Sequence, residues 1–148
     1  MSTRRTPWFA ILILGWVLYG ISLAVPAVIA DDPFGSDIHA GLDAAGYAIT
    51  GLFLDAPWYG VPSGLTNLIF LWSLWAIRRP KPSLTFGMIM VSLAVFNLGW
   101  LTEPMKGDYD ELLIGYYLWI SAFVLVGSAH IWGYLQAVIQ DENPGSKS

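Results

Sequence analysis

The chain has 148 residues, of which 55% are hydrophobic, 15% aromatic and only 12% charged, a composition too apolar for an ordinary soluble domain of this length. It contains no cysteine, which excludes disulfides, thiolate metal sites and iron–sulfur clusters. A formal net charge of −4, without any long run of Lys or Arg, argues against nucleic acid as a partner.

The charged residues leave four long uncharged runs. Each run exceeds the roughly 20 residues that a helix needs to cross the hydrocarbon core of a bilayer. We therefore predict an all-α polytopic membrane protein, a bundle of four transmembrane helices that forms a single membrane domain over residues 1–148. The expected transmembrane helices cover residues 8–30, 58–77, 83–101 and 112–139.

The first helix, 8–30, has an alternative interpretation as a signal peptide. Arg4 and Arg5 would form its basic region, and the segment 28–30 resembles a small-residue cleavage site. A retained transmembrane helix is favoured because the apolar run is longer than a signal-peptide core and contains Trp16 and Tyr19. Near its end, Pro26 is compatible with a kink.

The loop 31–57 is predicted to lie outside the membrane and to carry an amphipathic interfacial helix. Ser36 or Asp37 is the expected N-cap. Apolar residues recur at helical spacing at Ile38, Leu42, Ala45, Ile49 and Leu52, and the opposite face carries His39, Asp43, Gly46 and Thr50.

Four polar residues of this loop are candidates for outer-face chemistry: Asp31, Asp32, His39 and Asp43. His39 and Asp43 are four residues apart and could form half of a metal site or an acid–base pair. The alternative is a solvated polar face without chemistry, and we predict no resident metal and no cofactor.

The helices 58–77 and 83–101 are expected to form a hairpin, because two prolines in the turn 78–82 stop both. Asn67 and Asn97 lie toward the outer half of these helices, where they can face each other. Each should find a partner within the bundle, because an unpaired amide is costly in lipid. Alternatively, they line a polar outward cavity with Ser63, Thr66, Ser92 and Thr102.

The last helix, 112–139, is longer than a span requires, so it either tilts or projects into the cytoplasm. The tail 140–148 is polar and is expected to be solvated. His130 should lie close to the cytoplasmic interface. It either bonds a neighbouring helix or a headgroup, or serves a proton or a single-ligand cofactor.

The distribution of basic residues predicts the orientation. Arg4, Arg5, the turn 78–82 and Lys147 carry six of the seven basic residues, and only Lys106 breaks the alternation. The positive-inside rule therefore places both termini and the turn 78–82 in the cytoplasm, and the loops 31–57 and 102–111 outside. The predicted location is the cytoplasmic (inner) membrane, with a multi-pass topology.

Small residues mark where helices can approach closely. They recur four residues apart at Gly20 and Ala24, at Gly60 and Gly64, and at Ala129, Gly133 and Ala137. The spacing predicts helix packing, either within one chain or between two copies.

Three apolar segments carry a resemblance: Ser22–Pro26 ending the first helix, Trp58–Pro62 opening the second and Gly115–Trp119 opening the fourth. Together they resemble small uncharacterised bacterial membrane proteins with four transmembrane helices. The chain departs from that pattern at Val61, where Asn is expected. The resemblance implies the four-helix fold and no catalytic residues or substrate.

We expect no enzymatic activity, because no helix supplies even two groups that ionise near neutral pH. The favoured function is an accessory or interaction subunit in the lipid bilayer, binding another membrane protein, an external partner or a second copy of itself. Two alternatives remain: a channel or transporter for a small solute or ion, and an immunity-type protein whose acidic outer surface captures a cationic toxin.

Overall fold

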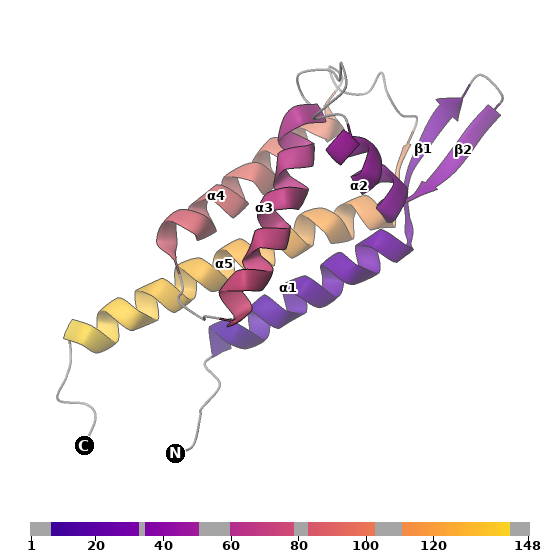
Figure 1. Ribbon diagram of the computed structural model, residues 1–148. Coiled ribbons are helices and arrows are strands. Elements are labelled where there is room, and N and C mark those ends of the chain that lie inside the picture. Colours follow the sequence, from indigo (N-terminus) through magenta and orange to yellow (C-terminus); the bar gives the residue numbers. More distant parts are fainter. Residues whose placement is uncertain (1–6, 33–34, 51–59, 79–82, 103–110, 143–148) are drawn as a thin grey trace.

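The computed structural model describes residues 7–32, 35–50, 60–78, 83–102 and 111–142, which are mostly helical (Figure 1). The elements in chain order are α1 (Pro7–Ala24), β1 (Pro26–Asp32), β2 (Gly35–Ala40), α2 (Gly41–Thr50), α3 (Gly60–Arg78), α4 (Leu84–Asn97), the 3₁₀ turn η1 (Leu98–Leu101), β3 (Glu111–Leu112) and α5 (Ile114–Glu142).

Three of the described helical segments are long and apolar enough to cross a membrane: Pro7–Ala24, Leu84–Leu101 and Ile114–Ile139. Their length and composition indicate a membrane protein. The expected second span, 58–77, corresponds to α3, and its role as a fourth crossing stays a prediction. In Figure 1, α1 begins and α5 ends at one end of the bundle, and the β1–β2 hairpin lies at the other.

The first helix is shorter than predicted. It ends at Ala24 rather than at residue 30, and the chain continues as strand β1. Pro26 explains the difference, because it lacks a backbone N–H and disfavours the helical conformation of Val25 before it. The prediction of a kink at Pro26 is therefore wrong: the helix stops there, and the β-branched Val28 and Ile29 extend into a strand.

The helix predicted in the outer loop also begins later than expected. Residues 35–40 form β2, antiparallel to β1, so Ser36 and Asp37 are strand residues and not N-caps. Helix α2 starts at Gly41, whose N–H donates to the Val25 carbonyl oxygen at 3.0 Å. Only glycine fits there, since a Cβ would collide with the Ser22 carbonyl oxygen.

Strand β1 lies in the middle of the sheet, in the order β2-β1-β3. Val28 lies opposite His39 in β2 and opposite Leu112 in β3. The Leu113 N–H also donates to the Ala27 carbonyl oxygen at 2.8 Å. The sheet therefore joins the segment after α1 to the entry of α5, and its β1–β2 hairpin projects from that end of the bundle (Figure 1).

The α4 helix begins as predicted from its turn. Ser83 is the N-cap, with its hydroxyl accepting from the Phe86 N–H at 3.3 Å. The predicted span 83–101 is divided into α4 and η1, so its last turn is wound more tightly than an α-helix.

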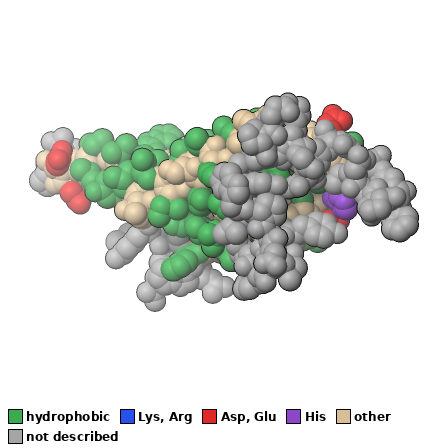
Figure 2. All heavy atoms as spheres, turned by 90° about the horizontal axis from the view of Figure 1, so that it is seen from above, with side chains coloured by type: hydrophobic (Ala, Val, Ile, Leu, Met, Phe, Trp, Pro, Cys, Tyr) green, Lys and Arg blue, Asp and Glu red, His purple; other side chains and the backbone are tan. Residues whose placement is uncertain are grey.

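The core lies between α1, α3, α4 and α5. Tyr19 stacks on Phe70 with ring centroids 4.2 Å apart, and Phe70 meets Phe123 edge-on at 4.9 Å. Leu12 and Val126 are fully buried beside them. Large apolar side chains also cover the outside of the helices, as Figure 2 shows along the bundle, which suits a surface solvated by lipid rather than water.

Glycines bring α5 close to two neighbouring helices. A Cβ on Gly15 would lie 2.7 Å from Val126 Cγ2, and one on Gly87 would lie 2.7 Å from the Gly127 carbonyl oxygen. Neither close approach involves the predicted small-residue stripes. Of those stripes, Gly64, Ala129 and Gly133 are buried, Gly20, Ala24 and Ala137 are exposed, and Gly60 lies outside the described side chains.

Candidate functional site

Two asparagines expected to be costly in lipid meet in one buried network. Asn67 on α3 is 1% exposed and Asn97 at the end of α4 is fully buried. The Ser63 hydroxyl donates to Asn97 Oδ1 at 2.6 Å, and Asn97 Nδ2 donates to Thr66 Oγ1 at 3.1 Å. Asn67 Nδ2 donates to the Ser63 carbonyl oxygen at 3.2 Å. The expectation that each asparagine finds a partner within the bundle is confirmed.

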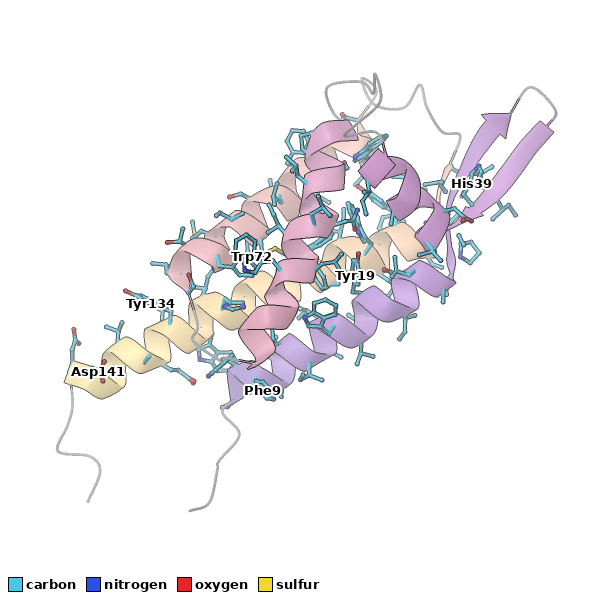
Figure 3. The ribbon with its side chains drawn as sticks, in the orientation of Figure 1. Phe9, Tyr19, His39, Trp72, Tyr134 and Asp141 are labelled. Carbon is cyan, nitrogen blue, oxygen red and sulfur yellow. The ribbon has the colours of Figure 1, made fainter. Side chains whose placement is uncertain are left out.

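Asn67 also links α3 to α1 and α5, the first and last helices of the chain. Its Oδ1 accepts from the Tyr19 hydroxyl of α1 at 3.1 Å and from Trp119 Nε1 of α5 at 2.9 Å. Figure 3 shows Tyr19 in the interior of the bundle. One carbonyl oxygen thus uses both of its lone pairs to join three helices.

Asn97 has further partners on its own helix and on α5. Its Nδ2 donates to the Leu93 carbonyl oxygen at 2.8 Å, and its backbone carbonyl accepts from the Tyr116 hydroxyl at 2.5 Å. The Trp100 Nε1 donates to Ser63 Oγ at 2.9 Å. In a medium without water, such mutual satisfaction removes the main cost of burying polar groups.

A second contact joins α1 to α3 farther along the bundle. Trp16 Nε1 donates to Ser73 Oγ at 3.1 Å, and Ser73 is fully buried. This bond explains a tryptophan far from the interfaces, where aromatic belts usually lie. Sequence reasoning missed Tyr19, Trp119 and Ser73; the available signal was that a buried Tyr or Trp needs a partner for its polar atom.

The alternative of a polar outward cavity loses two of its expected lining residues. Ser92 is exposed on the outside of α4, and the Thr102 hydroxyl bonds the Gly99 carbonyl oxygen at 2.5 Å. Only Ser63 and Thr66 join the asparagines, and each of the two is at most 4% exposed. Among the described residues, the network joins α1, α3, α4 and α5 through direct side-chain contacts.

His130 lies apart from this network, where α5 packs on the start of α4. It is 2% exposed, its Nδ1 accepts from the Ser83 N–H at 3.3 Å, and its ring meets Phe86 edge-on at 4.8 Å. Among the described residues, its Nε2 is the one buried side-chain nitrogen or oxygen without a hydrogen-bond partner.

The polar residues His39 and Asp43 of the outer loop lie on different elements rather than on one helix. His39 belongs to β2 and Asp43 to the first turn of α2, so the two are not neighbours on one helix face as predicted. Figure 3 shows His39 at the base of the hairpin. Asp31 and Asp32 end β1, and their side chains lie outside the described part. The described residues contain no group of three His, Asp or Glu suited to a metal ion.

Comparisons with known proteins add no relative: no protein-family model, no curated protein and no solved structure matches the chain. The resemblance to small four-helix membrane proteins therefore stays an expectation from three short motifs.

Proposed function

We propose that this chain is a small integral membrane protein that acts as an accessory or interaction subunit. One observation carries the proposal: the buried polar side chains where α1, α3 and α4 meet bond one another, from Tyr19 through Asn67 and Ser63 to Asn97. These side chains are all neutral, and they present no charged group of the kind that marks an ion pathway through a membrane. The surfaces that can bind other molecules are therefore those on the outside of the bundle.

Two parts of that outside suit protein partners. The helices expose large apolar side chains, with Trp72 68% exposed on α3, Val95 61% on α4 and Val17 52% on α1. The sheet and α2 lie at one end of the bundle, and the start of α1 and the end of α5 lie at the other (Figure 1). The first surface suits lipid or another membrane protein, and the second suits an external partner.

The proposed setting is the cytoplasmic membrane, with both termini in the cytoplasm and the sheet outside. The concentration of basic residues at positions 4–5 and in the turn 78–82 supports this orientation. The end of the bundle with the sheet is then the outer one, and its carboxylates face that compartment.

The test is isolation of the tagged full-length protein from its native membrane in a gentle detergent, with mass spectrometry of co-purifying proteins. A stoichiometric membrane-protein partner supports the accessory role. A homo-oligomer with no other protein, together with solute flux in reconstituted vesicles that Asn97→Leu abolishes, contradicts it.

A channel or transporter is the second candidate, and the unpartnered Nε2 of the buried His130 favours it. A buried imidazole nitrogen without a partner is available to a passing proton or ion. Proton flux in vesicles that is lost in His130→Leu and retained in Tyr134→Phe, a substitution on the same helix, would support this candidate.

A further inference from the structure

We propose that the free edge of β2 binds an extended, basic segment of a partner protein, which adds to the sheet as a fourth strand. The inference rests on the proposed function, because it names one site and one class of partner for an interaction protein. It concerns the end of the molecule that carries the sheet (Figure 1).

The edge is open because β2 is the first strand in the order β2-β1-β3 and pairs, among the described elements, with β1 alone. Its six residues, Gly35–Ala40, contain neither proline nor lysine. Those residues are two of the usual means by which proteins protect an edge strand from pairing. The outward backbone groups of such an edge are donors and acceptors for an incoming strand.

Two hydrogen bonds fix which backbone groups point outward. The Gly41 N–H points to the β1 side, where it donates to the carbonyl oxygen of Val25, the residue just before β1. Backbone groups alternate sides along a strand, so the groups of His39 point to β1 and those of Ile38 point away from it. The Ala27 carbonyl, which accepts from Leu113 on the β3 side, gives the same alternation for β1, in which Val28 faces His39.

The charges of the sheet indicate a basic partner. The three strands carry four carboxylates, Asp31, Asp32, Asp37 and Glu111, and no Lys or Arg. An added strand would lie about 5 Å from β2 and about 10 Å from β1. Those strand spacings are comparable with the screening length of about 8 Å at physiological salt, so the negative charge carried by the two strands attracts cations on an added strand.

The same charges oppose pairing of the edge with β2 of a second copy of the chain. Antiparallel pairing of two copies would bring Asp37 near its own counterpart, and like charges on neighbouring strands are destabilising. The whole chain also carries a net charge of −4, which repels a second copy at long range. Complementarity therefore favours a partner with Lys or Arg along an extended segment.

Ile38→Pro is the sharpest variant, because proline is tolerated on an edge strand where its missing N–H faces outward. Ile38 is 66% exposed, so the change removes little core packing. Ile38→Thr is the matched control, since it keeps the outward N–H and the preference for a strand. Thermal unfolding of both variants checks that the fold is retained.

The probe is a fluorescent peptide of about ten residues that alternates lysine and threonine. The full-length protein is held in phosphatidylcholine nanodiscs, which carry no net charge to attract the peptide, at about 0.15 M salt. Controls are a glutamate–threonine peptide and a lysine–threonine peptide with alternate backbone nitrogens methylated. Binding is followed by anisotropy, and amide exchange of residues 35–40 is measured with and without peptide.

We expect the basic peptide to bind and to protect the Ile38 amide from exchange. Ile38→Pro and the methylated peptide should each weaken binding at least about tenfold, and Ile38→Thr should change it less than about twofold. The acidic peptide should not bind. Equal binding to Ile38→Pro and to the parent protein would mean adsorption by charge alone and would overturn the proposal, as would no binding of the basic peptide at about 1 mM.

The outcome is separable from that of the accessory role. A membrane protein that co-purifies equally with Ile38→Pro and with the parent protein would support the accessory role through the helix faces and reject the edge as its docking site. Peptide binding that is weakened by Ile38→Pro and retained in Ile38→Thr, without any co-purifying membrane protein, would support binding at the β2 edge and reject the accessory role.

Discussion

The Ser63 hydroxyl donates a 2.6 Å hydrogen bond to Asn97 Oδ1 across the packing of α3 on α4. Both side chains are buried, at 4% and 0% exposure, and a third residue, Trp100, donates to the same Ser63 oxygen. The pair lies where the two helices of the predicted hairpin approach the sheet end. The hydrogen bond holds α3 and α4 in the one relative orientation in which both polar groups are buried and paired. A substitution at either residue therefore affects the packing of both helices.

Asn97→Leu should destabilise the bundle. The asparagine side chain makes three hydrogen bonds, with Ser63, Thr66 and the Leu93 carbonyl oxygen. At about 0.6 kcal/mol for each bond inside a membrane protein, the loss is roughly 2 kcal/mol in the free energy of unfolding. Unfolding of the purified protein in detergent measures it. Ser92→Leu on the exposed side of α4 is the control, and equal stability of the two variants would contradict the structural role of Asn97.

Tyr19→Phe and Trp119→Phe should be more harmful together than their separate effects predict. Each variant alone leaves Asn67 Oδ1 with one donor, whereas the double variant leaves a buried oxygen with none. A double-mutant cycle should therefore give a coupling of at least about 0.5 kcal/mol. The cycle of Trp119→Phe with Tyr117→Phe, whose side chain is 47% exposed, should be additive. Additivity in both cycles would show that the two donors act independently.

Three helices apolar enough to cross a membrane could be predicted from the gaps between charged residues, because the length of an apolar run is a property of the chain alone. The burial of Asn67 and Asn97 could be predicted for a similar reason: lipid offers no alternative partner for an amide. Which donors they find depends on the rotation and tilt of four helices. That is why Tyr19 and Trp119 were missed, although both need a partner for a polar atom.

The β1–β2 hairpin was not predicted, for a different reason. Residues 25–30 are as apolar as the helix before them, so hydropathy continues across the point where the helix ends. Pro26 and the β-branched Val28 and Ile29 were the local signals for a strand, and the pairing of β1 with β3 depends on residues more than eighty positions away. Composition alone cannot report such a long-range pairing.

Gly87→Ala should separate α4 from α5 and destabilise the protein. The new methyl group would lie 2.7 Å from the Gly127 carbonyl oxygen and 2.7 Å from Ile131 Cγ1, and the backbone oxygen cannot turn aside. Overpacking of this kind costs about 1–3 kcal/mol. Gly20→Ala is the matched control, because no atom lies within 4 Å of its added Cβ and alanine favours a helix. Unfolding in detergent should show a loss for the first variant and none for the second.

Reporter fusions should place the sheet end of the bundle outside. An alkaline phosphatase fused after Ala45 in α2 should be active, and one fused after Arg79 should be inactive, because the basic residues of the turn 78–82 are retained in the cytoplasm. A reporter with the opposite preference, green fluorescent protein, should give the reverse pattern at both sites.

The fold makes this test decisive for more than one loop. Since α1 begins and α5 ends at the end of the bundle opposite the hairpin, a single orientation fixes the side of both (Figure 1). Activity after Arg79 and none after Ala45 would invert the orientation. The carboxylates of the sheet would then face the cytoplasm, and the basic partner proposed for the β2 edge would have to be a cytoplasmic one. Replacing Arg78, Arg79 and Lys81 with Gln should weaken the preference if the basic turn is its cause.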